Sequence, residues 1–524
     1  MRIVLATLNA RYGHAALGLR CLLANMGELR PQCALVEGVI QDDPERFAER
    51  IAAHRPDVVG LSVSIWNRTP SLRVVRLLRA ACPQARIVLG GPEATHAPDD
   101  DPLVREADCV VAGEGDLAFA ELCRAFRDGH PLPRRLAAAK PDLALARLPF
   151  EEYDANDLAT RLISVEATRG CVYSCEFCLS SLEKGVRGYP LPEFLAGIDR
   201  LIARGCRTFR FVDRTFNLDP RRCEAILRFF LDRWPRDAQG RRIGSRQAVD
   251  GGPDAGAFFL HFEMVPDRLI APLRELLPQF PEGGVQLEIG IQSLDEQVNE
   301  RISRRQSSAV ALENLRWLRA HTGCHLHVDL IAGLPGETFA GFLAGFDRLY
   351  PACLDPAHGR AADLQVGILK LLPGTPLARH VDAFGMRFDP EPPYTILSSD
   401  ALDFATLMTI KRLARWVELT ANSHRFDRAL AALVASSLSP SAAFLGLSAF
   451  LSRHFGREHG IPEPALYEAV ALHLRGCGVD PMPLLAADFL DSRPPTAAGR
   501  KGVPEFLRAA VSALEPRDRV AHAR

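Results

Sequence analysis

Three cysteines lie within eight residues of one another, and no other stretch limits the chemistry of this chain so strongly. Cys171, Cys175 and Cys178 have the spacing C-x-x-x-C-x-x-C, and Gly170 before the first allows a tight bend. A four-iron cluster normally takes four cysteine thiolates, but the next cysteine along the chain is Cys206. Three thiolates leave one iron without a protein ligand. The spacing therefore predicts a 4Fe-4S cluster with one iron open to a small molecule.

Two simpler interpretations of the same stretch are a zinc site and a chance group of buried thiols. Structural zinc takes four ligands, usually in paired C-x-x-C or C/H spacings, and no histidine lies among these residues. The chain has 13 cysteines, but those outside this stretch are scattered singly. The cluster is therefore the favoured interpretation.

The residues around the cysteines resemble a known family. Phe177 stands before the last cysteine, and C-x-x-x-C-x-aromatic-C resembles the signature of the radical S-adenosylmethionine (SAM) enzymes. Four flanking segments resemble the branch with an N-terminal cobalamin-binding domain: Arg169-Gly170-Cys171, Cys178-Leu179-Ser180-Ser181, Asp213-Arg214-Thr215-Phe216-Asn217 and Gly333-Leu334-Pro335-Gly336-Glu337-Thr338. The resemblance implies that Cys171, Cys175 and Cys178 ligate the cluster and that the open iron binds the methionyl group of SAM.

Length and charge exclude several other classes of protein. At about 150 residues per domain, 524 residues predict about three domains. A formal net charge of −1 argues against nucleic acid or an anionic membrane as a partner. No apolar run reaches about 18 residues, so no membrane span is expected. The cysteines have no disulfide-framework spacing and the N-terminus has no signal cleavage site, which together predict a cytoplasmic protein.

Residues 1–130 alternate apolar runs with amphipathic stretches, a pattern typical of a parallel sheet covered by helices on both faces. We predict an α/β fold here, a doubly wound, Rossmann-like domain. Its expected strands are residues 3–8, 34–40, 57–64, 86–89 and 108–112. Ligands of such sheets lie beyond the carboxyl ends of the strands.

Small and polar residues at these strand ends form the candidate cobalamin site. Glycines at successive strand ends let a large ligand approach the backbone, although each turn alone is also ordinary strand-to-helix chemistry. In this order, ahead of the cysteines, the turns resemble the cobalamin-binding domain of that branch. The resemblance implies contacts to cobalamin from Ser62, Ser64, Gly90, Gly91, Pro92, Glu93, Gly113, Glu114 and Gly115.

The better-known cobalamin motif, D-x-H-x-x-G, supplies a histidine that replaces the lower axial base, and it does not occur in this chain. His14 follows the first expected strand, but Gly18 lies four residues on and no aspartate stands two residues before it. We therefore expect no protein histidine on cobalt.

Residues 131–160 are rich in proline, from Pro131 to Pro149, and proline at this density interrupts regular structure. We predict a linker there, followed by a partial β/α barrel over residues 161–379. Its expected strands are residues 162–167, 207–212, 258–263, 285–291, 325–331 and 364–369. The functional loops of such a barrel lie at the carboxyl ends of its strands, and the cysteines follow the first strand. Residues 236–256 predict an exposed insertion.

Polar groups at the remaining strand ends form the candidate SAM site. The resemblance implies that the second to fifth strands hold the ammonium, carboxylate and ribose of SAM. Gly333 opens a turn that lies beside the adenine in the family, and no lysine follows it, so a P-loop is excluded. Asp329 and Lys370 fit either this site or ion pairs of the barrel core. The candidate SAM residues are Phe177, Asp213, Arg214, Glu263, Gln292, Ser293, Gly333 and Pro335.

Residues 380–524 lack strand-like runs and show helical periodicity, so we predict an α-helical third domain with a loose polar tail from about Pro494. The stretch 422–425 fits a cap on the substrate cavity or, more simply, a turn between helices. Several residues resemble a C-terminal module of unassigned function found on a subset of these enzymes: Tyr394, Asn422, Ser423, Arg425 and Phe426.

Family chemistry implies that an electron reaches the cluster and cleaves SAM to a 5′-deoxyadenosyl radical, which abstracts hydrogen from a substrate. Cobalamin would carry a methyl group, making the protein a C-methyltransferase for an unactivated carbon of a small molecule. The implied electron donor is a protein such as flavodoxin or ferredoxin. Two alternatives stay open: a cobalamin-dependent rearrangement or cyclisation without methyl transfer, and a non-catalytic cobalamin or iron–sulfur sensor.

Both predicted sites lie at carboxyl ends of parallel strands. A methyl transfer through a carbon radical needs the substrate to reach both cofactors in one water-poor space. We therefore expect the turns at Gly91 and Gly113 to face the cysteine stretch across a single cavity.

Overall fold

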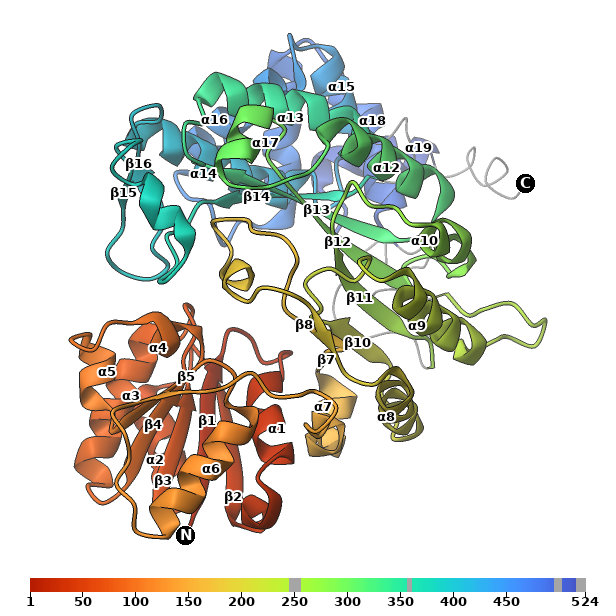
Figure 1. The fold of residues 1–524 in the computed structure, drawn as a ribbon. Helices are drawn as coiled ribbons and strands as arrows, with labels where there is room; N and C mark the ends of the chain where they lie inside the picture. Colours follow the sequence, from red (N-terminus) through yellow and green to blue (C-terminus); the bar gives the residue numbers. More distant parts are fainter. Residues whose placement is uncertain (245–255, 356–360, 494–501, 515–524) are drawn as a thin grey trace.

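The computed structural model describes residues 1–244, 256–355, 361–493 and 502–514. Along the chain they form a sheet domain, an open barrel and a set of C-terminal helices. In Figure 1 the sheet domain lies at the lower left, the barrel strands lie in the centre, and the C-terminal helices cover the top.

Six parallel strands build the first sheet in the order β2-β1-β3-β4-β5-β6. Ile3 at the start of β1 is in register with Cys33 on one side and Val58 on the other. All of β1 is buried, because helices cover both faces of the sheet. The strands are β1 (Ile3–Asn9), β2 (Cys33–Val39), β3 (Val58–Ser62), β4 (Arg86–Gly90), β5 (Cys109–Ala112) and β6 (Arg135–Ala137).

Two layers of helices enclose this sheet and give it two apolar cores. α1 (Leu17–Ala24) and α6 (Gly115–Arg127) pack on one face. The other face is covered by α2 (Pro44–Ala52), α3 (Arg68–Ala81) and α5 (Pro102–Glu106). The doubly wound fold is thereby confirmed.

A second sheet of six parallel strands has the order β14-β13-β12-β11-β10-β7, so neighbours in the chain are neighbours in space. β7 and β14 form its two edges, which makes it the expected partial barrel. Its strands are β7 (Ile163–Val165), β10 (Thr208–Phe211), β11 (Phe259–Met264), β12 (Val285–Gln292), β13 (His325–Ala332) and β14 (Asp363–Ile368). Its helices are α8 (Leu191–Ala203), α9 (Pro220–Arg233), α10 (Ala271–Leu276), α11 (Glu296–Arg301), α12 (Ser308–His321) and α13 (Phe339–Cys353).

Side chains of the barrel strands divide into two sets. In β12 and β13 fully buried residues alternate with half-buried ones, as the twofold period of a strand requires. The buried set packs into the main apolar core with the surrounding helices. The half-buried set includes Glu288, Gln292, His327 and Asp329, so the other face of the sheet carries polar groups.

The proline-rich region contains more regular structure than its sequence pattern indicated. β6 adds a parallel edge strand beside β5, and η2 (Pro149–Glu152) and α7 (Ala155–Thr160) follow before the barrel begins. Asp154 and Asp157 form a capping box at the start of α7. The segment is therefore built into both domains.

Five helices of the C-terminal region share one apolar core with the barrel. They are α14 (Phe404–Thr420), α15 (Asp427–Ala435), α16 (Pro440–Phe455), α17 (Glu463–Gly476) and α18 (Pro481–Asp491).

Two expectations for this region were wrong. A short antiparallel pair, β15 (Arg387–Phe388) and β16 (Ile396–Ser398), precedes the helices. In the tail, η7 (Glu505–Leu507) and α19 (Arg508–Leu514) bury Leu507 and Val511 against the core. Residues 494–501 and 515–524 of the expected tail, and most of the 236–256 insertion, lie outside the described residues.

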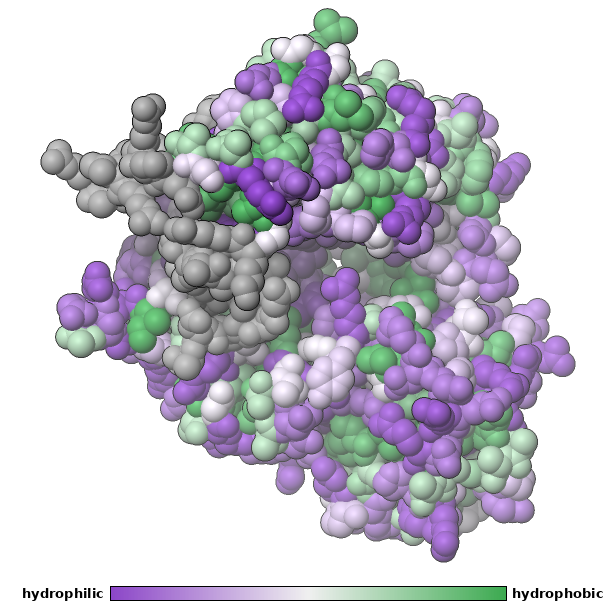
Figure 2. Space-filling view, turned by 180° about the vertical axis from the view of Figure 1, so that it is seen from behind, coloured by the Kyte–Doolittle hydropathy of each residue, from purple (hydrophilic) through white to green (hydrophobic). Residues whose placement is uncertain are grey.

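In the described residues no single helix is long and apolar enough to cross a membrane, and one bent pair, α15 with α16, passes by length and composition alone. Figure 2 shows hydrophilic residues spread over much of the opposite side of the molecule and a hollow between its upper and lower parts.

Candidate functional site

The cysteine loop is framed by a small ribbon. β8 (Thr168–Arg169) pairs antiparallel with β9 (Arg187–Gly188), and the loop runs between them. Gly170 has φ +90°, and a Cβ there would lie 2.2 Å from the Gly185 carbonyl oxygen. Only glycine fits this position, because the backbone is left-handed and the Gly185 carbonyl, just before β9, leaves no space for a side chain.

The three cysteines are arranged to suit a cluster better than a single ion. Tyr173 donates its backbone N–H to Cys171 Sγ at 3.4 Å, and Arg304 donates to Cys175 Sγ at 3.4 Å. Such donors stabilise negative charge on cluster sulfurs. The Sγ atoms of Cys171, Cys175 and Cys178, all within the described residues, do not all lie within 4.8 Å of one another. A four-iron cluster needs this wider spacing, because each thiolate binds a different iron.

Glu176, inside the cysteine motif, anchors the loop to two distant segments. Its carboxylate accepts hydrogen bonds from Ser303 Oγ at 2.6 Å and from Arg379 Nε at 2.8 Å, and it lies 2.8 Å from His380 Nε2. The Glu176 side chain is 4% exposed. These contacts hold the loop against Ser303 of the barrel and against the segment that contains Arg379 and His380.

A cavity of about 620 Å³ lies between the cysteine loop and the carboxyl ends of the first sheet. Residues on both sides of the cysteines contribute to it, from Thr168 to Gly170 and from Leu179 to Glu183. The carboxyl end of β3 and the turns after β4 and β5 form the opposite wall. Across this cavity the first sheet and the flanks of the cysteine loop face each other.

Glycines make room for a large ligand in this cavity. A Cβ at Gly18 would meet no atom within 4 Å, and one at Gly90 would meet only a carbonyl oxygen at 3.9 Å. Gly91 has φ +89°, and a Cβ there would lie 2.4 Å from the Val63 carbonyl oxygen. Gly91 is therefore required by close packing against Val63, whereas the backbone at Gly90 lies open, which fits the approach of a corrin ring.

Most candidate cobalamin residues line this cavity, namely Ser62, Gly90, Gly91, Pro92, Gly113, Glu114 and Gly115. Ser64 does not; it is buried, and its backbone N–H donates to Asn67 Oδ1 at 2.8 Å. Glu93 does not either; it is 3% exposed and accepts a hydrogen bond from Tyr394 Oη at 2.8 Å. Burial raises the pKa of Glu93. Glu93 therefore joins the first domain to the C-terminal region.

The candidate SAM residues from the second and third barrel strands lie in different environments. Arg214 lines the cavity and lies 3.6 Å from the carboxylate of Glu263 at the end of β11. Asp213 is 2% exposed and accepts hydrogen bonds from Ala167 N at 3.0 Å and Thr168 Oγ1 at 2.5 Å. Asp213 therefore fixes the strand from which the cysteine loop departs.

The remaining candidate SAM residues lie around the barrel mouth. Gln292 ends β12 with a left-handed φ of +68°. Ser293 is buried and its Oγ accepts from Asp295 N at 3.2 Å. Gly333 donates its N–H to Glu337 Oε2 at 2.8 Å, and the Pro335 carbonyl accepts from Arg301 at 3.4 Å. Phe177 is half-buried against the barrel core.

Carboxylates gather inside the barrel near its mouth. Burial, with Glu288 and Glu263 nearby, raises the pKa of Asp329 to about 8. His261 Nε2 lies 3.0 Å from Glu288, and this hydrogen bond lowers the pKa of Glu288. Asp329 has a distant partner in His327, at 3.8 Å. This concentration of acidic groups suits a cationic ligand.

Arg169 links the cysteine loop to the first domain, and sequence reasoning did not assign it this role. Its guanidinium binds Asp116 through two bonds of 2.9 Å, Glu114 at 2.9 Å and Glu166 at 2.6 Å. Arg187, on β9, also binds Glu114. The carboxylate of Glu114, on the first domain, thus binds two arginines that flank the cysteine loop.

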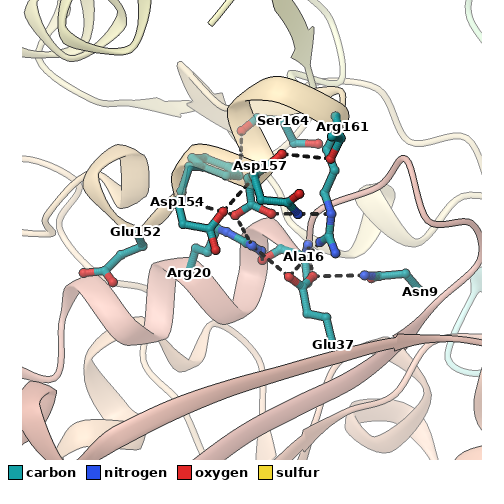
Figure 3. A network of polar contacts seen from close by, with 12 residues as sticks. Asn9, Ala16, Arg20, Glu37, Glu152, Asp154, Asp157, Arg161 and Ser164 are labelled. Atoms are coloured by element: carbon teal, nitrogen blue, oxygen red, sulfur yellow. Dashed lines mark hydrogen bonds and ion pairs between the residues drawn. The ribbon is translucent and has the colours of Figure 1, made fainter. Parts of the chain in front are cut away.

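A second network of ion pairs and hydrogen bonds joins the same two domains (Figure 3). Arg20 on α1 is 2% exposed and binds Glu37 at 2.7 Å and Asp157 at 2.6 Å. Arg161, just before β7, binds Glu37 at 2.9 Å. Because these charged groups are paired and almost fully buried, they fix the orientation of the first sheet relative to the barrel.

The sequence analysis did not assign several polar residues that line the cavity, among them His96, Lys140 and Glu166. Burial raises the pKa of Glu166 to about 7, although Arg169 opposes this shift. Glu166 directly follows β7, so its position at the end of a strand could have identified it as a candidate. Lys140 and His96 carried no such signal, because neither belongs to a recognisable motif.

Three domain families match the chain in turn: the B12 binding domain over residues 3–123, the radical SAM superfamily over residues 165–348, and a protein of unknown function, DUF4080, over residues 382–487. The chain belongs to the radical SAM enzymes that carry an N-terminal B12-binding domain, in the subset with this C-terminal domain. The cofactors of this class are a 4Fe-4S cluster, SAM and cobalamin.

Two curated relatives have stated activities. The cobalamin-dependent radical SAM methyltransferase TokK of Streptomyces tokunonensis is 25% identical over 80% of this chain and 62% of its own length. The 2-(S-pantetheinyl)-carbapenam-3-carboxylate methyltransferase of Streptantibioticus cattleyicolor is 26% identical over 64% of this chain and 50% of its own length. The chain thus spans less than two thirds of either relative.

Solved structures agree on the fold. The cobalamin-dependent S-adenosylmethionine radical enzyme OxsB, with aqua-cobalamin and S-adenosylmethionine bound, superposes with a TM-score of 0.61 at 12% identity, over 98% of this chain and 83% of OxsB. The radical S-adenosylmethionine methyltransferase TsrM from Kitasatospora setae gives 0.56 at 19% identity, over 75% of this chain and 80% of TsrM.

Proposed function

We propose that this protein is a cobalamin-dependent radical SAM methyltransferase that methylates an unactivated carbon of a small molecule. One observation carries the proposal: a single cavity is lined by the glycine turns of the B12-type sheet and by the flanks of the cysteine loop. A substrate in this cavity lies within reach of both cofactor sites. The relatives named as methyltransferases support the same reaction class.

When bound, the cofactors supply a radical generator and a methyl carrier, and the protein positions and shields them. Cys171, Cys175 and Cys178 would hold the cluster. The acidic interior formed by Glu263, Glu288 and Asp329 would attract the positively charged groups of SAM. The turns at Gly91 and Gly113 would bring backbone against the corrin.

The electron donor and the compartment belong to the same proposal. A reducing cytoplasm suits a cluster held by three cysteines and a chain without disulfides among its described cysteines. A low-potential protein such as flavodoxin or ferredoxin would supply the electron.

The test is anaerobic incubation of the reconstituted chain with cobalamin, a reductant and SAM labelled with a deuterated methyl group. We expect 5′-deoxyadenosine and S-adenosylhomocysteine, and, with an extract from cells lacking the gene, a new product carrying the deuterated methyl group. The Cys171→Ala, Cys175→Ala, Cys178→Ala triple variant should form no 5′-deoxyadenosine.

Other outcomes separate the alternatives. 5′-Deoxyadenosine with a changed but unlabelled product would indicate rearrangement or cyclisation. Cobalamin and cluster binding without any SAM cleavage would contradict the enzyme assignment and favour a sensor.

A further inference from the structure

Two histidines and an aspartate meet at the end of the barrel opposite the cysteine loop. His325 is the first residue of β13 and Asp363 the first residue of β14. His424 lies in the turn between α14 and α15. His325 Nε2 is 3.0 Å from Asp363 Oδ2, and His424 Nε2 is 2.9 Å from Asp363 Oδ1. The ligand atoms of all three residues lie within 4.8 Å of one another.

The turn between α14 and α15 is fixed to the edge of the barrel. The side-chain amide of Asn422 accepts from Leu364 N at 2.9 Å and donates to the Leu364 carbonyl at 3.0 Å. This pair of bonds extends the β14 edge as a neighbouring strand would. His424 follows with a left-handed φ of +52°, a conformation uncommon outside glycine. This turn confirms the simpler expectation for residues 422–425 and brings the imidazole back to Asp363.

We propose that His325, Asp363 and His424 bind one divalent transition-metal ion, with zinc the best match, and that this ion ties the C-terminal helices to the barrel. Imidazole nitrogen and carboxylate oxygen are both zinc ligands, and two histidines with one carboxylate are a known three-residue set that leaves a position for water. The three side chains are 14%, 17% and 25% exposed, so water has access. His424 Nδ1 lies 3.7 Å from Asp427 Oδ1, on the side of the ring away from Asp363, as expected for a carboxylate that orients a metal-binding imidazole.

The location indicates a structural role for the ion. Amino-terminal ends of barrel strands serve stability, while carboxyl-terminal ends carry catalysis. None of the three residues lines the cavity between the first sheet and the cysteine loop. The ligands come from two adjacent barrel strands and one C-terminal turn, so a bound ion would cross-link segments 99 positions apart, from 325 to 424. Such a link stabilises the folded chain by the free energy of ion binding.

The test uses the full-length chain after anaerobic cluster reconstitution, equilibrated with zinc at a free concentration set by a competing chelator. Elemental analysis should give one tightly bound zinc per chain. His325→Ala, His424→Ala and Asp363→Asn should each weaken zinc binding roughly tenfold or more. His473→Ala is the matched control, because this half-buried histidine on α17 packs against Phe450, and its zinc content should equal the parent's.

A second measurement excludes the cluster thiolates as the zinc ligands. In the Cys171→Ala, Cys175→Ala, Cys178→Ala background, zinc binding should persist, and cobalt(II) in its place should show ligand-field bands without thiolate charge transfer. Zinc should also raise the thermal midpoint of the parent but not that of Asp363→Asn. The proposal is wrong if the parent binds no zinc, or if the three site variants bind it like the parent. His325, Asp363 and His424 would then interact only through hydrogen bonds and ion pairs.

Discussion

Arg169 and Asp116 form a bidentate ion pair, in which Nη1 and Nη2 of the guanidinium each lie 2.9 Å from one carboxylate oxygen. Arg169 stands two residues before Cys171. Asp116 lies in the first turn of α6, just after the strand-end glycines. The two candidate cofactor sites are therefore coupled by a short, buried contact. Movement of one domain against the other must break it.

Replacing Arg169 by Ala should destabilise the protein strongly. Asp116 and Glu166 would be left buried without their cation, while Glu114 would keep only Arg187. Breaking such a buried pair costs about 3–5 kcal/mol. Denaturant unfolding should report this loss, together with weaker retention of cobalamin. Arg200→Ala is the control, because its pair with Glu151 is 55% and 58% exposed and such pairs contribute about 1 kcal/mol or less. Equal losses in the two variants would show that the Arg169 contact does not hold the domains.

Gly170→Ala should prevent cluster assembly. The new Cβ would lie 2.2 Å from the Gly185 carbonyl oxygen, so the ribbon that frames the cysteines must shift. Gly185→Ala makes a sharp control in the same loop, because its φ is +84° and its Cβ would meet nothing within 4 Å. Iron and acid-labile sulfide per chain should fall in Gly170→Ala and stay near the parent value in Gly185→Ala. Full cluster content in both would mean that the ribbon does not position the thiolates.

Glu337 should make stability depend on pH. Burial raises its pKa to about 8, although backbone hydrogen bonds from Gly333 and Leu334 oppose the shift. Because the folded pKa exceeds the ordinary value of 4.5, the contribution of Glu337 is fully present below about pH 4.5 and is lost as pH rises through about 8. Each pKa unit corresponds to about 1.4 kcal/mol.

Glu337→Gln isolates this effect, since the amide keeps the shape and the acceptor oxygen. The free energy of unfolding of the variant, relative to the parent, should rise across the window from about pH 4.5 to 8. A difference that stays constant over that window would show that Glu337 has an ordinary pKa in the fold.

Most strands could be predicted, and the exceptions share a physical cause. Long strands such as β1 and β13 can be recognised in the sequence, by a continuous apolar run in β1 and by the alternation of apolar and polar residues in β13. β6 has only three residues and β15 only two, too few for any period to show.

The candidate site shows a different limit. Strand-end position correctly brought Gly90, Gly91 and Gly113 to one cavity, because parallel strands end at the same edge. The partners of polar side chains could not be read in this way. Glu93 meets Tyr394, which is 301 positions away, and no local pattern records such a contact.

No histidine of the chain should coordinate cobalt. His14 forms a backbone bridge to Leu162 instead of standing in a D-x-H-x-x-G motif, while His96 is the imidazole that lines the cavity. The electron paramagnetic resonance spectrum of bound cob(II)alamin should lack nitrogen splitting from a protein imidazole, and His14→Ala and His96→Ala should leave it unchanged. A splitting that disappears in either variant would identify an axial ligand and contradict this expectation.

The central claim is that both cofactors bind at one shared cavity, and pulsed electron paramagnetic resonance tests it most directly. The reconstituted chain with cob(II)alamin and reduced cluster contains two unpaired-electron centres. We predict a strong dipolar coupling between them, which vanishes in the Cys171→Ala, Cys175→Ala, Cys178→Ala variant while the cobalt signal remains. Two uncoupled spectra from a chain that holds both cofactors would place the centres far apart and contradict the account.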